Sequence, residues 1–115
     1  VHLDPAAARK EALAALAILE PLAVEIPDES MRGQAAEAAV ALGRAEEARG
    51  DRAAARAAYE KAVALLAPCR RPIRHWKQLA PWVKAQFGLG RRDEALPELR
   101  RLLGMGYRGA DVATL

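Results

Sequence analysis

The stretch LGRAEEARGDRAAARAAYEKAVALLAP, residues 42–68, decides the fold. It holds two alanine-rich segments joined by Gly50-Asp51, a pair typical of the end of one helix and the start of the next. Pro68 marks a stop after the second segment. Alanine and leucine, both strong helix formers, supply most of the apolar residues elsewhere in the chain. The stretch therefore predicts a helical hairpin within an all-α protein.

Working outward from this hairpin, we expect five helices, at about residues 4–24, 30–49, 52–67, 75–88 and 92–103. Asp4-Pro5 is expected to start the first helix, because aspartate is a good N-cap and proline suits the first helical position. Pro27 should separate the first two helices, and Gly90 should end the fourth. Gly104 is the expected C-cap of the fifth helix, and the tail of residues 105–115 has room for one more turn.

Three prolines fall inside predicted helices, where proline removes a hydrogen bond and costs about 3 kcal/mol. They are Pro21, Pro81 and Pro97. Either these helices kink or their boundaries lie elsewhere. For Pro81, the alternative is a late first helical turn that leaves residues 73–80 irregular.

A spacing of 40 residues relates corresponding positions in successive hairpins. It links Gly50 with Gly90 at the turns and Leu42 with Trp82 in the preceding helices. The following helices share three sets of positions at this spacing: Ala15, Ala55 and Ala95; Leu19, Tyr59 and Leu99; Leu22, Ala62 and Leu102. A fixed period between helical hairpins indicates a repeat architecture.

At these positions the chain resembles the tetratricopeptide repeat. The residues that match the family pattern are Leu42-Gly43, Gly50-Asp51, Ala55, Tyr59, Ala62 and Pro68. Gly43 and Ala55 are small where the two helices would cross, and Tyr59 would fill the space beside them. The 40-residue period exceeds the family's usual ~34, and the surplus fits in loop 69–74. HEAT-like repeats have a period near 40, but the Gly-Asp turn argues against them.

The resemblance implies one domain of about two and a half repeats. Its parts are a half repeat at 4–24, repeats at 30–68 and 75–104, and the tail. The charged stretch 89–95 and Gly106-Tyr107-Arg108 also resemble the repeat tails of some bacterial Ser/Thr kinases and signalling regulators. Since the chain contains no kinase motif, any kinase would lie outside it.

For function, the tetratricopeptide resemblance implies a non-catalytic scaffold that binds a peptide or protein segment in a concave groove. Its groove positions fall on Val40, Arg44, Glu47, Lys77, Lys84 and Phe87, with Ala80 beside them. Arg44, Lys77 and Lys84 would make the groove basic, so an acidic segment or a C-terminal carboxylate is the expected ligand. Trp82 aligns with a core position, whereas Phe87 suits groove and core equally.

Two further functions stay open. Residues 70–77 combine four basic side chains with Trp76, a pattern able to grip nucleic acid, although a solvated loop explains it more simply. The third possibility is an oligomerisation segment. The first helix carries apolar residues around much of its circumference, and in a full repeat the helix expected to cover them would lie upstream of this chain. A homodimer through residues 4–24 is therefore expected.

Composition excludes several function classes. The net charge of +3 is only mildly basic, which makes nucleic acid an unlikely partner. No apolar run approaches the roughly 18 residues of a membrane helix, and the lone Cys69 fits a reducing, cytoplasmic location. His2, His75 and Cys69 match no metal or nucleophile spacing. We therefore expect no enzyme activity, no cofactor and no metal.

Overall fold

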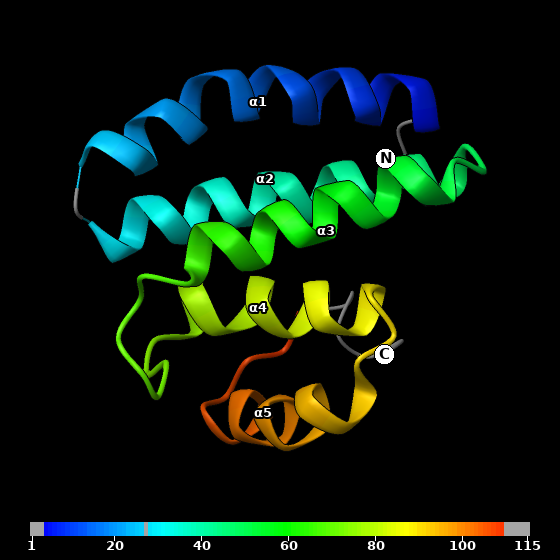
Figure 1. Cartoon of the computed structure of the whole chain (residues 1–115). Coiled ribbons are helices and arrows are strands. Elements are labelled where there is room, and N and C mark those ends of the chain that lie inside the picture. Colours follow the sequence, from blue (N-terminus) through cyan, green and yellow to red (C-terminus); the bar gives the residue numbers. More distant parts are fainter. Residues whose placement is uncertain (1–3, 27, 110–115) are drawn as a thin grey trace.

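The computed structural model describes residues 4–26 and 28–109, and all of its regular secondary structure is helical. Within these residues there are five α-helices and no strand: α1 (Pro5–Glu25), α2 (Glu29–Ala48), α3 (Arg52–Leu66), α4 (Trp76–Gly88) and α5 (Arg92–Gly104). The expected all-α class is confirmed. The helices stack with α1 and α5 at opposite ends, and α3 contacts both α2 and α4 (Figure 1). His2, Pro27 and residues 110–115 of the tail lie outside the described part.

Side chains cap the first four helices where they begin. Asp4, Asp28 and Asp51 each accept a hydrogen bond from a backbone N–H of the first turn of α1, α2 and α3. His75 does the same for α4, its Nδ1 lying 3.2 Å from the Lys77 nitrogen. The helix therefore starts at Trp76, and the alternative with residues 73–80 irregular is wrong.

The two glycine turns, at Gly50 and Gly90, have the same backbone hydrogen bonds at corresponding positions. Gly50 and Gly90 have φ of 83° and 78°, a region that only glycine enters without strain. In each turn the glycine N–H bonds to a carbonyl three residues earlier, and the next N–H bonds to a carbonyl five residues earlier. This is the Schellman pattern that closes a helix C-terminus. The 40-residue spacing therefore correctly located both turns.

The C-cap expected at Gly104 is two residues off. Gly104 is the last residue of α5, and Gly106 takes the positive φ, 92°, with its N–H bonded to the Leu103 carbonyl. No further helical turn follows within residues 105–109. The described part of the tail is therefore irregular, and it runs back from α5 towards α4 (Figure 1).

All three internal prolines lie inside helices, and Pro81 shows how one of them is accommodated. Because Pro81 has no N–H, the Lys77 carbonyl lacks its usual partner four residues on. Gly33 of α2 lies against this carbonyl so closely that a Cβ at Gly33 would come within 2.8 Å of the oxygen. The next side chain, Gln78, donates from Nε2 to the Glu29 carbonyl at 2.8 Å. Together these contacts bind the start of α4 to the start of α2.

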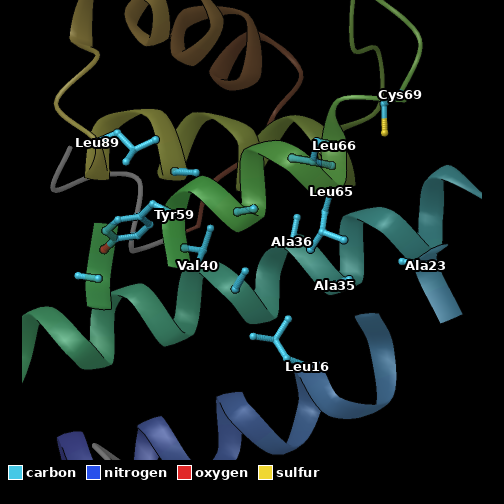
Figure 2. Close-up of a cluster of buried hydrophobic side chains, with 14 residues drawn as sticks. Leu16, Ala23, Ala35, Ala36, Val40, Tyr59, Leu65, Leu66, Cys69 and Leu89 are labelled. Atoms are coloured by element: carbon cyan, nitrogen blue, oxygen red, sulfur yellow. The ribbon is translucent and has the colours of Figure 1, made fainter. Parts of the chain in front are cut away.

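Two hydrophobic clusters form the core. The larger one joins α1, α2 and α3 with the end of α4, and it includes Leu16, Val40, Leu66 and Leu89 (Figure 2). The smaller one lies between α4 and α5. Trp82 packs against both clusters, which supports its predicted place in the core. Because many members of the larger cluster are alanines with short side chains, the helices must approach closely to exclude water.

One aromatic ring lies where α2, α3 and α4 come close together. Tyr59 of α3 lies between Gly43 of α2 and Gly88 of α4. A Cβ added to Gly43 would stand 2.5 Å from the ring, and one added to Gly88 would stand 2.6 Å from the ring's opposite edge. Neither glycine position therefore has room for a side chain while the ring stays in place. The expected role of Tyr59 beside Gly43 is confirmed, whereas the sequence did not indicate that of Gly88.

We expect Gly43→Ala to destabilise the protein by about 1–3 kcal/mol, the usual cost of overpacking a filled core. In a Tyr59→Leu background, which removes the ring, the same substitution should cost clearly less. Chemical denaturation measures all four free energies of unfolding. Gly104→Ala is the control, because open space surrounds that position and alanine favours helix. Additive effects of Gly43→Ala and Tyr59→Leu would contradict the packing described here.

Candidate interaction site

The face of α2 that points away from α3 is the natural place to look for a binding surface. Glu37, Ala41, Arg44 and Ala48 recur on it at helical spacing, and each is exposed or half-exposed. The residues that α2 turns towards the core, by contrast, are nearly all alanine or glycine and are buried. We refer to these four residues, together with Lys84 of the neighbouring α4, as the groove face.

A hollow of about 470 Å³ opens on the groove face where the start of α1 passes the end of α2. Its lining is mainly apolar and comes from Pro5, Ala8, Val40, Ala41, Ala45 and Ala48. Glu37 and Arg44 also line it and supply one charge of each sign. The hollow therefore offers small apolar contacts next to a guanidinium and a carboxylate.

A buried lysine joins α4 to this face. The side chain of Lys84 is only 4% exposed, and its Nζ lies 3.1 Å from the Glu37 carboxylate, which is 43% exposed. The ammonium also lies 5.7 Å from the centre of the Tyr107 ring, a cation–π distance. The charge of Lys84 is thus engaged inside the protein and contributes little to attracting a ligand.

The tail covers the part of the groove face that belongs to α4. Tyr107 packs against Trp76 at 5.7 Å between ring centres, besides lying over Lys84. Arg108 holds the segment in place by donating to the Leu103 carbonyl at 3.1 Å. As a result, the open portion of the face runs along α2 and the start of α1.

The six groove residues predicted from the sequence do not lie on one surface. Val40 is 1% exposed and belongs to the core, Lys84 is buried, and Phe87 packs in the cluster between α4 and α5 with Arg92 over its ring. Lys84 and Phe87 are therefore not open groove residues as predicted, whereas Val40, although buried, lines the hollow. Of the others, only Arg44 lines the hollow on the groove face.

Glu47 and Lys77 lie away from that hollow, and so does Ala80. Glu47 is exposed at the α2–α3 turn, Lys77 stands 5.9 Å from the Trp76 ring, and Ala80 is fully buried. The positions taken from the family do not allow for the packing of α4 against α2 and α5, which buries Lys84 beside Glu37 and places Phe87 in the α4–α5 cluster.

The basic loop between α3 and α4 is tied to the rest of the fold. The Arg70 N–H donates to Glu29, and the Arg71 guanidinium lies 6.0 Å from the centre of the Trp82 ring. All four basic side chains of residues 70–77 are exposed, and Trp76 is half-exposed beside Lys77. The loop therefore presents positive charge with one accessible aromatic ring.

Cys69 and His75 both line a small hollow at this loop, and each of them has a structural role there. Cys69 packs in the larger core cluster, and burial, followed by the nearby Glu29 carboxylate, raises the pKa of its thiol. His75 caps α4. A raised pKa keeps the thiol protonated and thus poorly nucleophilic.

Sequence reasoning missed most residues of the site, including the alanines that line the hollow, the Glu37 carboxylate and Tyr107, which covers the α4 part of the face. Glu37 lies 47 positions from Lys84, a separation outside the 40-residue pattern. Tyr107 follows the last predicted helix, where periodicity carries no signal.

Among the described residues, no helix combines the length and the apolar character that crossing a membrane requires.

The Lys84–Glu37 ion pair predicts an unequal response to two matched substitutions. Glu37→Gln removes a carboxylate from a buried ammonium and should cost about 1–3 kcal/mol of unfolding free energy. Glu20→Gln removes the carboxylate of Glu20–Lys61, an ion pair of the same 3.1 Å length between two half-exposed side chains, and should cost under about 1 kcal/mol. Urea denaturation of both variants measures the difference, and equal losses would contradict the buried pairing.

Tyr59 predicts a loss of stability at alkaline pH. Burial, and then a hydrogen bond to Glu47, raise the pKa of Tyr59 well above its usual range. The protonated phenol thus favours the folded state, so its contribution is complete below about pH 10, the pKa of an unfolded tyrosine, and declines above it. Tyr59→Phe should flatten this decline in denaturation measured from pH 8 to pH 11. An unchanged slope would show that Tyr59 is not the group involved.

Comparison with known proteins assigns no family to this geometry. No protein-family model matches the chain, and neither a curated protein nor a solved structure matches it. The tetratricopeptide resemblance accordingly rests on the residues of 42–68 alone, and the function has to be argued from the site itself.

Proposed function

We propose that this chain is a non-catalytic, tetratricopeptide-like interaction module that binds a segment of a partner protein on its groove face. The observation that carries the proposal is the alanine-lined hollow beside Arg44. Such a surface suits an extended or helical segment, because the alanine methyl groups can contact its apolar side chains and leave the hydrogen bonds of its backbone undisturbed. The rigid helices on both sides keep the surface formed in the absence of a ligand.

The preferred segment combines an apolar side chain with a carboxylate. The apolar side chain enters the hollow, where it contacts Ala41 and Ala48. The carboxylate meets Arg44, whose guanidinium has enough donors to bind a ligand and an internal partner together. Because Lys84 is engaged by Glu37, a long run of acidic residues gains little over a single well-placed one.

The basic loop supports a second candidate function, the binding of single-stranded nucleic acid. Trp76 is half-exposed between Arg74 and Lys77, an arrangement in which a base can stack on the indole while the cations meet phosphates. Against this, one face of the ring already packs on Tyr107. The two candidates separate cleanly, since one depends on Arg44 and the other on residues 70–77.

We expect Arg44→Glu to weaken the binding of a fluorescent peptide that carries leucine and glutamate by at least about tenfold. Arg56→Glu is the matched control, because Arg56 is exposed on α3 and makes the same change in net charge. Anisotropy titrations at low and physiological salt measure both affinities, and wild-type binding should weaken as salt rises. Equal losses in the two variants would show that net charge, and not the groove face, controls binding.

A labelled single-stranded oligonucleotide serves in the same assay. Binding that is tighter than that of the peptide, and that is lost in an Arg70→Glu/Arg71→Glu variant but kept in Arg44→Glu, would establish the second candidate and reject the first.

A further inference from the structure

The outer face of α1 is an apolar stripe that no other part of the described chain covers. Ile18 is 65% exposed and Val24 is 67% exposed. The residues of the stripe, all exposed and on one side of the helix, are Leu13, Ala14, Ala17, Ile18, Pro21 and Val24. Helix α1 packs on α2 with its opposite side. A continuous apolar surface of this kind favours association.

The other end of the stack is built differently. The exposed residues of α5 are mostly charged or polar in character: Arg92, Asp93, Glu94, Pro97 and Arg100 precede the single large apolar residue Leu103. A charged outer face is what a terminal helix needs to remain in water. Of the two ends of the stack, α1 is therefore the one suited to a partner.

Two opposite charges mark the ends of the stripe. Lys10 lies one turn before Leu13 and Glu25 directly follows Val24, and both side chains are exposed. With 3.6 residues per turn, both fall on the same side of α1 as Ala14, Ala17 and Pro21. Glu11 is also exposed, but it lies about 100° around the helix from Lys10, at the edge of the stripe beside Ile18. Along its middle the stripe thus carries Lys10 at the N-terminal end, whereas Glu25 lies at the C-terminal end.

We infer that the stripe binds the same stripe of a second copy of this chain, with the two α1 helices antiparallel. A two-fold axis between Ala17 and Ile18 places Lys10 of each copy opposite Glu25 of the other. The same axis places Ala14 opposite Pro21 and sets Ile18 against the small Ala17. A parallel arrangement instead brings Lys10 to Lys10 and Glu25 to Glu25. Charge complementarity therefore selects the antiparallel dimer.

The dimer is independent of the proposed binding function. Ala8, which lines the hollow on the groove face, lies nine residues before Ala17 and so on the opposite side of α1. Dimerisation therefore leaves both hollows open. A failure of peptide binding says nothing about the dimer, and the reverse also holds.

Sedimentation velocity of the 115-residue chain between about 1 and 200 µM tests the association. We expect a monomer–dimer equilibrium in the micromolar range, because two single helices make a small interface. Ile18→Glu should leave only monomer at every concentration, with unchanged helical circular dichroism. The control, Leu103→Glu, places the same charge on an apolar residue at the other end of the stack and should keep the dimer. A wild-type monomer throughout, or a dimer that survives Ile18→Glu, overturns the inference.

Charge exchange tests the antiparallel order. Lys10→Glu and Glu25→Lys should each weaken self-association by about three- to tenfold, since each creates two like-charge contacts. A mixture of the two variants should form dimers at wild-type strength, because each contact then joins opposite charges. Parallel pairing predicts a different result, namely that Lys10→Glu binds wild-type chain more tightly than wild-type binds itself. That result, or a mixture no stronger than its components, overturns the antiparallel arrangement.

Discussion

The position of Tyr59 between Gly43 and Gly88 is the constraint on which the rest of the structure depends. The ring is a single rigid spacer, so it sets at once how closely α3 approaches α2 and α4. Elsewhere these helices meet through alanine side chains that reach only a short way, among them Ala39, Ala55 and Ala62. Such a core excludes water only if the helix separation is right, and one aromatic ring between two glycines provides that separation.

The same constraint brings α2 and α4 together on the side away from α3. Their approach allows the Lys77 carbonyl, freed by Pro81, to rest on Gly33, and it allows Gln78 to reach the Glu29 carbonyl. It also places the Lys84 ammonium beside Glu37. The buried lysine is therefore tolerated because the neighbouring helix supplies a carboxylate for its ammonium, and the helix start before Pro81 is held by the Gln78 hydrogen bond to α2.

The sequence predicted what depends on local chemistry and fixed spacing. Gly50 and Gly90 were correctly located as turns because a positive φ requires glycine, and Tyr59 beside Gly43 followed from the hairpin pattern. The sequence could not predict which way a residue faces where three helices meet. Gly88 stands where the 40-residue spacing pairs it with Ala48, so its contact with Tyr59 left no signal in the repeat.

The candidate site was less predictable than the fold for the same reason. Whether Lys84 is a surface cation or a buried one depends on Glu37, on another helix, and on Tyr107 in an irregular tail. Neither residue belongs to the repeating pattern. A long aliphatic stem lets lysine pack against apolar neighbours in either state, and the buried state needs a partner for the ammonium, so the residue's identity alone decides nothing. The 40-residue spacing therefore located the turns, whereas the helix separation and the charges that reach the solvent depend on residues outside that spacing, such as Gly88, Glu37 and Tyr107.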